Sequence, residues 1–371
     1  MPPAVKVNQQ MIADRLKVSV ATVSKALSNE NGVSEATRLK VVETATKLGY
    51  LAERTKKLNR QAGVVHQHRF IGVLARSSYQ PGSFAVPSSY FEAIAGVASD
   101  LNVTLVPQEI LHSVDDHAIL DPANQSPALR NGSLSGLLVM GQWSPDVIRK
   151  LNAIAPCVVL PFTIPDIQID QIGLDHNGAV ADLIAHLHGL GHRRIGFFGK
   201  CHSLSWSTER FAGYVNGLSR FDLGYDPSAV IDIAEAPLME EGHDEAWAGH
   251  IEQAYAATQG GVTAWVCSSD WPGNQLHRGL VAAGLSVPGD LSITGFDDSE
   301  PVTLGMPPLT TTYLPRPEMG KAAVKQLIHR ILEPDAEPCR MQFACPLRDH
   351  ATTAPPKTQP AASSDVARAT H

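Results

Sequence analysis

The chain has 371 residues, of which 43% are hydrophobic and 18% are charged, and its formal net charge at pH 7 is −7. This length is too great for one ordinary domain and leaves enough apolar side chains for large buried cores. No stretch is apolar over the 18 or more residues that a membrane span needs, and the N-terminus lacks the apolar core of a signal peptide. We therefore expect a cytoplasmic protein without a membrane partner.

Three short amphipathic helices are predicted at the start of the chain. The first runs from an N-cap at Asn8 to about Lys17, and the second from an N-cap at Ser19 to Leu27. Apolar residues recur at helical spacing and should face inward: Met11, Ile12, Ala13, Leu16, Val23, Ala26 and Leu27. This arrangement is typical of a helix-turn-helix, which lays its second helix in the major groove of DNA.

A third helix is predicted from near Ser34 to Gly49, a natural stop. Thr37 and Arg38 should face solvent. The residues expected to pack inward are Leu39, Val42, Ala45 and Leu48.

Short side chains remain for the outer surface and N-terminal end of the second helix. They are Ser19, Val20, Ala21, Thr22, Ser24 and Lys25. Such a helix can sit deep in a groove while its hydroxyls reach phosphates or base edges. The alternative is that the three helices form a small interaction module.

Charge favours the DNA-binding interpretation. Residues 1–63 hold eleven Lys and Arg against five acidic residues, a net charge of +6, so the remainder carries −13. A basic head on an acidic body is expected when only one end of a protein meets phosphate.

After a polar, basic hinge or linker at residues 50–69, strands and helices are predicted to alternate to about residue 350. Expected strands cover residues 70–75, 103–107, 136–140, 157–161, 169–174, 194–199, 264–268 and 291–296. Expected helices cover residues 90–100, 145–154, 177–190, 208–219, 244–257, 273–283 and 316–332. This rhythm predicts parallel, doubly wound α/β sheets, and the length favours two lobes. Residues 351–371 are rich in Pro, Ala, Ser and Thr, and we expect a disordered tail.

Cofactor and metal motifs are not found in the sequence. It has neither a Walker-type phosphate loop nor a GxGxxG turn between strand and helix, and its histidines lack metal-ligand spacing. The cysteines, at positions 157, 201, 267, 339 and 345, form no CxxC pair and are interpreted as buried small hydrophobes in a reducing compartment. We expect no cofactor, no metal and no catalytic residues.

The N-terminal pattern closely resembles the lactose-repressor (LacI/GalR) family of bacterial transcription regulators. In the head the resemblance rests on residues 12–13, 18–25, 37–38 and 48–50. In the body it rests on Gly191–Gly196, Arg210–Tyr214, Gly295–Asp298 and Pro308–Thr311, in the family's order. It implies a body like a periplasmic sugar-binding protein, with a ligand cleft between two α/β lobes, and a homodimer on a roughly palindromic operator. Effector binding would then change DNA affinity.

Carried over by position, the resemblance implies that Val20, Ala21 and Lys25 read bases, with Thr22 and Ser24 nearer the DNA backbone. The family more often has Arg or His at position 25, and Lys lacks the planar fork that engages guanine with two hydrogen bonds. The other expected DNA contacts are Asn29, Tyr50, Lys56 and Lys57.

The hinge departs from the family. Many members have a Pro at position 52 and a minor-groove leucine at position 59, whereas this chain has Ala52 and Asn59. A leucine wedge that kinks DNA is therefore in doubt. Lys56 and Lys57 could instead grip phosphates.

The effector site implied by the resemblance centres on Arg210 and Asp297. Arg can donate two hydrogen bonds to vicinal hydroxyls or a carboxylate, and Asp can accept from hydroxyls. The alternative is that the two residues form a structural ion pair. The other expected ligand contacts are Ser77, Ser78, Tyr79, Trp206, Ser269 and Asp270.

The sequence thus predicts a ligand-responsive DNA-binding regulator, a repressor of carbohydrate-uptake or degradation genes with a sugar as its effector. A solute-binding protein and a sugar-processing enzyme that share the two-lobed fold are the alternatives. A solute-binding protein fits poorly with the basic head.

Overall fold

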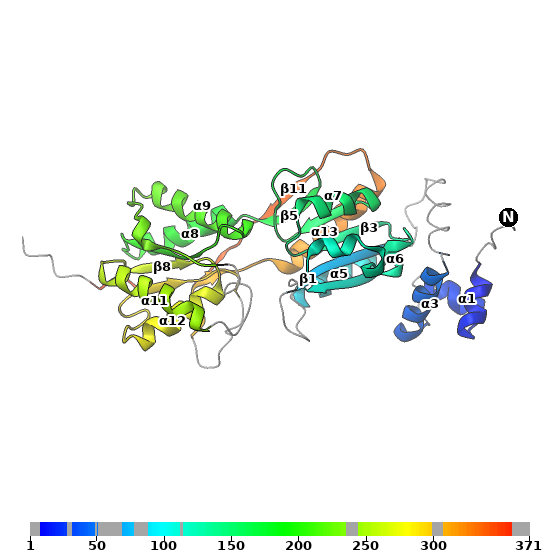
Figure 1. The fold of residues 1–371 in the computed structure, drawn as a ribbon, viewed down its shortest axis with the longest axis horizontal. Helices are drawn as coiled ribbons and strands as arrows, with labels where there is room; N and C mark the ends of the chain where they lie inside the picture. The colour runs from blue at the N-terminus through cyan, green and yellow to red at the C-terminus, as the bar shows by residue number, and fades with distance from the viewer. Residues whose placement is uncertain are drawn as a thin grey trace, which may run out of the picture. The chain divides into compact units, whose positions relative to one another are not determined.

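The computed structural model describes residues 8–27, 32–48, 50, 69–77, 88–111, 114–234, 244–298 and 307–357. The chain divides into two compact units. Unit 1 comprises Met1–Leu174 and Pro315–Phe343, and unit 2 comprises Asp175–Leu314 and Ala344–His371. The chain therefore passes from one unit to the other three times (Figure 1).

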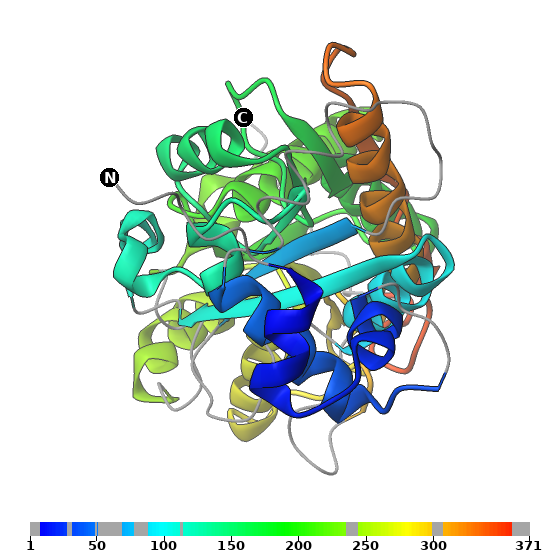
Figure 2. The same cartoon turned by 90° about the vertical axis from the view of Figure 1, so that its right-hand side faces the viewer.

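The head consists of α1 (Gln9–Leu16), α2 (Val20–Leu27) and α3 (Glu35–Lys47), the dark blue helices of Figure 2. The predicted caps of α1 and α2 are confirmed: Asn8 accepts from the Met11 N–H at 3.0 Å, and Ser19 accepts from the Thr22 N–H at 3.0 Å. Lys17 ends α1 in the left-handed conformation, with φ 54°. That reversal produces the short turn from which α2 begins.

The buried side of the head follows the predicted pattern in α1 and α2 and departs from it in α3. Ile12, Val23 and Leu27 are fully buried. The prediction that Leu39 packs inward is wrong, because its exposed fraction is 59%, and Val41 is buried instead. At 100° per residue, Leu39 lies roughly 110° from the mean direction of Val41, Val42 and Ala45, so it cannot share their face.

Unit 1 is built on a six-stranded sheet whose registered neighbours are all parallel. Its order is β11–β5–β4–β3–β1–β2. The strands are β1 (Arg69–Ser77), β2 (Val103–Leu111), β3 (Gly136–Met140), β4 (Cys157–Leu160), β5 (Asp170–Leu174) and β11 (Arg340–Phe343). The helices are α5 (Ser88–Asp100), α6 (Pro127–Arg130), α7 (Pro145–Ile154) and α13 (Arg316–Leu332), with 3-10 turns at Asp116–Leu120 and Pro122–Asn124. Helices α5 and α13 pack against each other, and α13 also covers β3, β4 and β5.

Unit 2 has a four-stranded parallel sheet in the order β7–β6–β8–β9. The strands are β6 (Ile195–Lys200), β7 (Val230–Asp232), β8 (Ala264–Cys267) and β9 (Ser292–Thr294). The helices are α8 (His176–Gly189), α9 (Ser205–Arg220), α11 (Asp244–Gln259) and α12 (Asp270–Ala282), with a 3-10 turn at Pro227–Ala229. The α8–α9 and α11–α12 pairs lie on opposite sides of the strands (Figure 1). A separate antiparallel pair joins β10 (Thr311–Thr312) to β12 (Leu347–Arg348).

The predicted fold class is confirmed by the helical head and the two parallel α/β sheets. The sequence pattern missed β7, β10, β11 and β12, which are two to four residues long and therefore show little periodicity. No described helix combines the length and the apolar composition needed to cross a bilayer.

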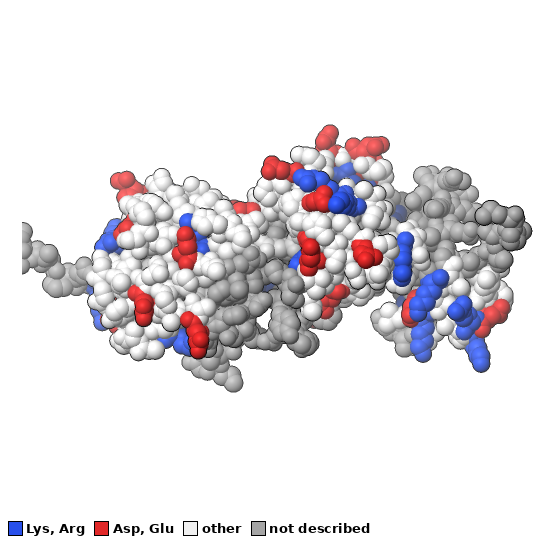
Figure 3. All heavy atoms as spheres, in the orientation of Figure 1, with Lys and Arg blue, Asp and Glu red and all other residues white. Residues whose placement is uncertain are grey.

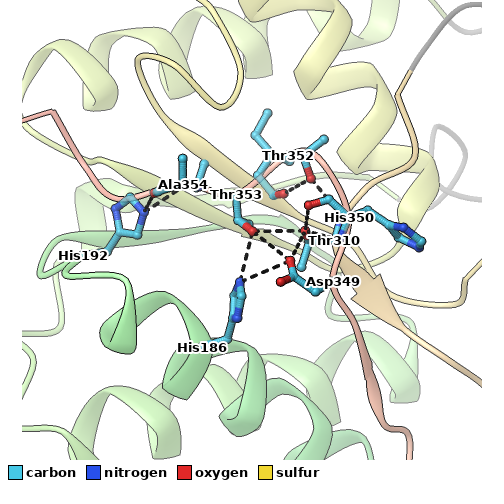
Figure 4. A network of polar contacts seen from close by, with 10 residues as sticks. His186, His192, Thr310, Asp349, His350, Thr352, Thr353 and Ala354 are labelled. Carbon is cyan, nitrogen blue, oxygen red and sulfur yellow. Dashed lines mark hydrogen bonds and ion pairs between the residues drawn. The ribbon is translucent and has the colours of Figure 1, made fainter.

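Residues 351–357 do not fit the disorder that we expected from residue 351. Thr352 is fully buried, and its hydroxyl donates to the Ile293 carbonyl at 2.7 Å and accepts from the Thr310 N–H at 2.8 Å. His192 holds the Ala354 carbonyl at 2.9 Å (Figure 4). This segment is therefore hydrogen-bonded along β9, a contact that its amino-acid composition does not predict. The rest of the expected tail, residues 358–371, lies outside the described residues.

The five cysteines are free thiols, as predicted, and four of them are buried; Cys339 is half-buried. Burial raises the pKa of the Cys157 thiol far above its ordinary value. Such a thiol is a small apolar side chain rather than a nucleophile.

Candidate nucleic-acid interface and effector site

Helix α2 presents two exposed side chains one turn apart. Ala21 and Lys25 are exposed, whereas Val20, Thr22 and Ser24 are half-buried. The buried face of the same helix, formed by Val23, Ala26 and Leu27, fixes α2 against the rest of the head.

Basic side chains gather on the described helices of the head, where blue spheres outnumber red ones in Figure 3. Lys25 belongs to this set. The Ser19 hydroxyl caps α2 by accepting from the Thr22 N–H, and it lies 2.8 Å from the Thr22 hydroxyl. Ser19 is exposed at the N-terminal end of the helix, where a phosphate could approach.

The other predicted DNA contacts are placed only in part. Tyr50 is half-buried and packs on the apolar cluster that includes the head. Asn29, Lys56, Lys57 and hinge residues 51–68 lie outside the described residues.

In unit 2, the candidate effector residues lie at the carboxyl edge of the sheet. The chain runs from β6 outward to β7 and then back to β8 on the other side, so the strand order reverses between β6 and β8. Ligands of open parallel sheets bind at such a switch point, beyond the carboxyl ends of the strands. Ser268 directly follows β8 at that edge.

Arg210 on α9 reaches this edge and is held by three acceptors. Its Nε–H donates to His176 Nδ1 at 3.2 Å, one terminal nitrogen donates to the Ser268 carbonyl at 2.5 Å, and the other donates to Asp297 Oδ1 at 2.9 Å. The exposed fraction of its side chain is 3%, whereas that of Asp297 is 28%. Burial lowers the pKa of Arg210, and the nearby Asp297 carboxylate opposes that change. The carboxylate is therefore the accessible end of the pair.

Two aromatic rings lie close to the guanidinium. Its central carbon lies 3.6 Å from the ring centre of Phe296 and 4.7 Å from that of Trp206. Trp206 lies one turn before Arg210 on α9 and is buried. Because the face of an aromatic ring attracts a cation, the two rings stabilise the buried charge and restrict its movement.

The backbone at Asp297 is strained. Its φ is 119° and that of Asp298 is 47°, in a region that favours glycine. Asp297 is held there by the hydrogen bond from its N–H to the Thr312 carbonyl at 3.2 Å and by Arg210. Strain of this kind, of order 1–3 kcal/mol, concentrates where a side chain is aimed at a ligand.

Ser269 and Asp270 are turned into the unit. The Asp270 carboxylate accepts from the Thr311 hydroxyl at 2.6 Å, and its backbone N–H donates to the Phe296 carbonyl at 2.8 Å. A Cβ at position 295 would stand 2.0 Å from the Asp270 carboxylate, so only glycine fits there. Asp270 thus holds the strand end that carries Asp297, and buried Ser269 is the N-cap residue of α12.

The unit 1 candidates are described least. Ser77 is the last residue of β1, at the carboxyl end of its strand. Ser78 and Tyr79 lie outside the described residues.

Three residues at this site were missed by sequence reasoning: His176, Ser268 and Phe296. His176 begins α8 directly after the strand ending at Leu174, so a polar residue at the carboxyl end of a predicted strand could have pointed to it. Phe296 lies within the Gly295–Asp298 motif, and nothing in the sequence distinguishes it from an ordinary core aromatic residue.

In unit 1, Asp115, Asp116 and His117 bring metal-ligand atoms together. Their hydrogen bonds explain the group structurally. Asp115 caps the 3-10 turn by accepting from the His117 N–H at 3.0 Å, and Asp116 accepts from the Ser144 N–H at 2.5 Å.

A helix-turn-helix head and two parallel α/β units with polar residues at a sheet edge define a class, the DNA-binding regulators with a periplasmic-binding-protein-like body. Comparisons with known proteins agree. The model described as bacterial regulatory proteins, lacI family, matches residues 10–53, and that described as periplasmic binding protein-like domain matches residues 184–353. The chain carries a LacI-family DNA-binding domain and a periplasmic-binding-protein-like domain, and it is a DNA-binding transcriptional regulator.

Relatives of known name match along most of the chain. The HTH-type transcriptional repressor CytR of Escherichia coli (strain K12) is 29% identical over 327 residues, which cover 86% of this chain and 88% of that protein. The ribose operon repressor of Haemophilus influenzae is 28% identical over 330 residues, covering 87% and 92%. A lac repressor dimer bound to operator and the anti-inducer ONPF has the same fold, with a TM-score of 0.65 at 22% identity, covering 94% and 99%.

Proposed function

We propose that this regulator is a cytoplasmic repressor of genes for carbohydrate uptake or degradation. Its homodimer binds operator DNA through α2, and a sugar bound at the Asp297–Arg210 site changes that affinity. The observation that carries the proposal is the buried Arg210 fork, which presents a strained and accessible Asp297 carboxylate at the sheet edge.

The chemistry of the site suits hydroxyl groups. Arg210 already faces the Asp297 carboxylate at 2.9 Å, so the pair is close to neutral and offers little net charge to an anionic ligand. A carboxylate that reaches solvent accepts hydrogen bonds from hydroxyls. The buried Trp206 and Phe296 rings hold the guanidinium, which leaves the carboxylate as the part of the pair that a ligand can reach.

The names of the relatives also support a sugar-responsive repressor. A ribose operon repressor is among them, and a lac repressor with this fold is a dimer on its operator. They are transcription regulators, which favours this function over a solute-binding protein or a sugar-processing enzyme. A sugar regulates DNA affinity only by binding one arrangement of the chain better than another.

The DNA half of the proposal is tested with Lys25→Ala. The fluorescence anisotropy of a labelled fragment from upstream of this chain's own gene measures the affinity. We expect Lys25→Ala to weaken binding by at least about fivefold, because a base contact contributes roughly 1–3 kcal/mol. The matched control is Lys40→Ala, which removes an exposed lysine from α3 and should have the smaller effect. Equal effects of the two substitutions would refute the docking of α2.

A further inference from the structure

His176 is the one neutral side chain among the three acceptors that hold Arg210. It is 1% exposed and begins α8, where the side chain of Asp175 caps the helix by accepting from the Gly178 N–H at 2.8 Å. The cap fixes the first turn of α8 and therefore the direction from which the imidazole approaches α9.

The protonation state of His176 follows from its partner. Arginine has no acceptor atom, so the contact at 3.2 Å requires Nδ1 to accept the Nε–H of Arg210. Burial, with the positive charge of Arg210 as the second cause, holds the pKa of His176 well below its ordinary value. The ring is therefore neutral, and its proton is on Nε2.

The contact at Nε fixes more than one hydrogen bond. A guanidinium is planar, so holding Nε and one terminal nitrogen determines where the other terminal nitrogen points. His176 holds Nε and the Ser268 carbonyl holds one terminal nitrogen, so the remaining nitrogen is directed at Asp297.

Resting on the function proposed above, we infer that His176 is a positioning residue for the effector site: it accepts the Arg210 Nε–H and thereby aims the guanidinium that orients Asp297. A carboxylate in its place would add a second negative charge beside Asp297, and an apolar residue would leave a charged N–H unpaired. Neutral imidazole supplies the hydrogen bond without changing the charge of the site.

The Nε2–H of His176 is buried and has no acceptor among the described residues. Leaving a buried donor unpaired is unfavourable. That the chain keeps a histidine here, and not an apolar side chain, agrees with a requirement for the acceptor on its other nitrogen.

Three substitutions separate the two nitrogens. In His176→Asn the amide oxygen can occupy the place of Nδ1. In His176→Gln the amide reaches the place of Nε2, and His176→Leu removes both polar groups. The Asn and Gln variants are matched in chemistry, so the comparison holds even if the Leu variant fails to fold.

The direct measurement is hydrogen exchange of the Arg210 Nε–H in ¹⁵N-labelled full-length protein without ligand, with the resonance assigned from Arg210→Lys. We expect slow exchange in the unmodified protein and in His176→Asn. Exchange should be roughly tenfold faster in His176→Gln and His176→Leu, the change expected for one hydrogen bond to a charged group. Equal exchange rates in the Asn and Gln variants would overturn the inference.

A functional arm separates this inference from the proposed function. Ribose is added to protein and labelled DNA, and the change in DNA affinity is compared between His176→Gln and Asp297→Asn. If Asp297→Asn responds as the unmodified protein does while exchange at Arg210 follows the pattern above, the effector assignment fails and the positioning role stands. If Asp297→Asn loses the response while His176→Gln alters neither response nor exchange, the proposed function stands and the positioning role fails.

Discussion

A largely buried arginine–aspartate pair in unit 1, Arg330–Asp170, can be compared with one in unit 2, Arg210–Asp297, and the two pairs are built in opposite ways. In unit 1 the carboxylate of Asp170 is fully buried and Arg330 is 12% exposed, whereas in unit 2 the guanidinium of Arg210 is buried and the Asp297 carboxylate is 28% exposed. An arginine–aspartate pair can therefore stabilise the interior of a unit or present a hydrogen-bonding group to a ligand, depending on which partner reaches solvent.

The unit 1 pair is saturated by donors. Asp170 accepts from Arg330 Nε at 2.7 Å, from Gln326 Nε2 at 3.1 Å and from the Cys339 N–H at 2.7 Å. These bonds join β5, α13 and the start of β11, and the hydrogen bond to Asp170 raises the pKa of Arg330. Every donor comes from unit 1 itself, which marks this pair as structural.

The largest effect that tests this contrast is expected from matched Asp-to-Asn substitutions. Asp170→Asn replaces one buried acceptor oxygen by an amide N–H₂ that faces other donors, and it removes the charge that pairs with Arg330. It should lower the free energy of unfolding by about 3–5 kcal/mol. Asp297→Asn removes the carboxylate beside the buried guanidinium but keeps an oxygen for Arg210 at a partly exposed position, so it should cost less, about 1–2 kcal/mol. Urea unfolding followed by tryptophan fluorescence measures both. Similar losses of unfolding free energy would mean that both pairs serve to stabilise the fold, which would contradict the contrast between them.

A smaller effect concerns the dependence of stability on pH, because the pKa of a histidine is shifted in opposite directions in the two units. In unit 2, burial lowers the pKa of His192, which is 1% exposed and bonds Ala354 and Thr263. In unit 1, a hydrogen bond to Asp115 raises the pKa of exposed His117. Acid therefore favours unfolding at His192 and opposes it at His117.

The sign at His192 is set by proton uptake on unfolding. Below the unfolded pKa of about 6.5 the unfolded chain binds a proton that the folded chain does not. Stability should then fall by up to about 1.4 kcal/mol per pH unit for this group. His192→Gln, which has no titrating proton, should show a flatter decline between pH 6.5 and 5 in the same urea experiment. An unchanged slope would show that His192 is protonated in the folded state.

Most of the fold could be predicted from the sequence, because it depends on local signals. Asn8 and Ser19 cap the first two head helices as predicted, and the alternation of strands and helices indicates parallel sheets. The prediction for Leu39 is wrong because its spacing of three residues from Val42 was taken as a shared face, whereas the buried face is centred on Val41, Val42 and Ala45. The bonding of Thr352 to β9 escaped prediction because its partner, Ile293, is far away in the sequence.

The effector site could be predicted only in outline. Arg210 and Asp297 were chosen by resemblance, and the structure brings them to 2.9 Å, but their role in ligand binding remains a proposal. The acceptor role of His176 could not be found, since it depends on α8 and α9 meeting and on burial that keeps the ring neutral. A role that depends on the charge of a neighbouring side chain produces no periodic pattern in the sequence, so it cannot be predicted from that pattern.

The central claim is that a sugar bound at the Arg210–Asp297 pair of unit 2 changes the affinity of the protein for DNA. It is tested most directly by titrating a panel of pentoses, hexoses and disaccharides, ribose among them, into the protein bound to labelled upstream DNA. For Asp297→Asn we expect the DNA affinity without sugar to match that of the unmodified protein. The sugar concentration that gives the half-maximal change should rise by roughly tenfold or more, the loss expected for a hydrogen bond to a charged group. An Asp297→Asn variant that responds at the same sugar concentration as the unmodified protein would contradict the account.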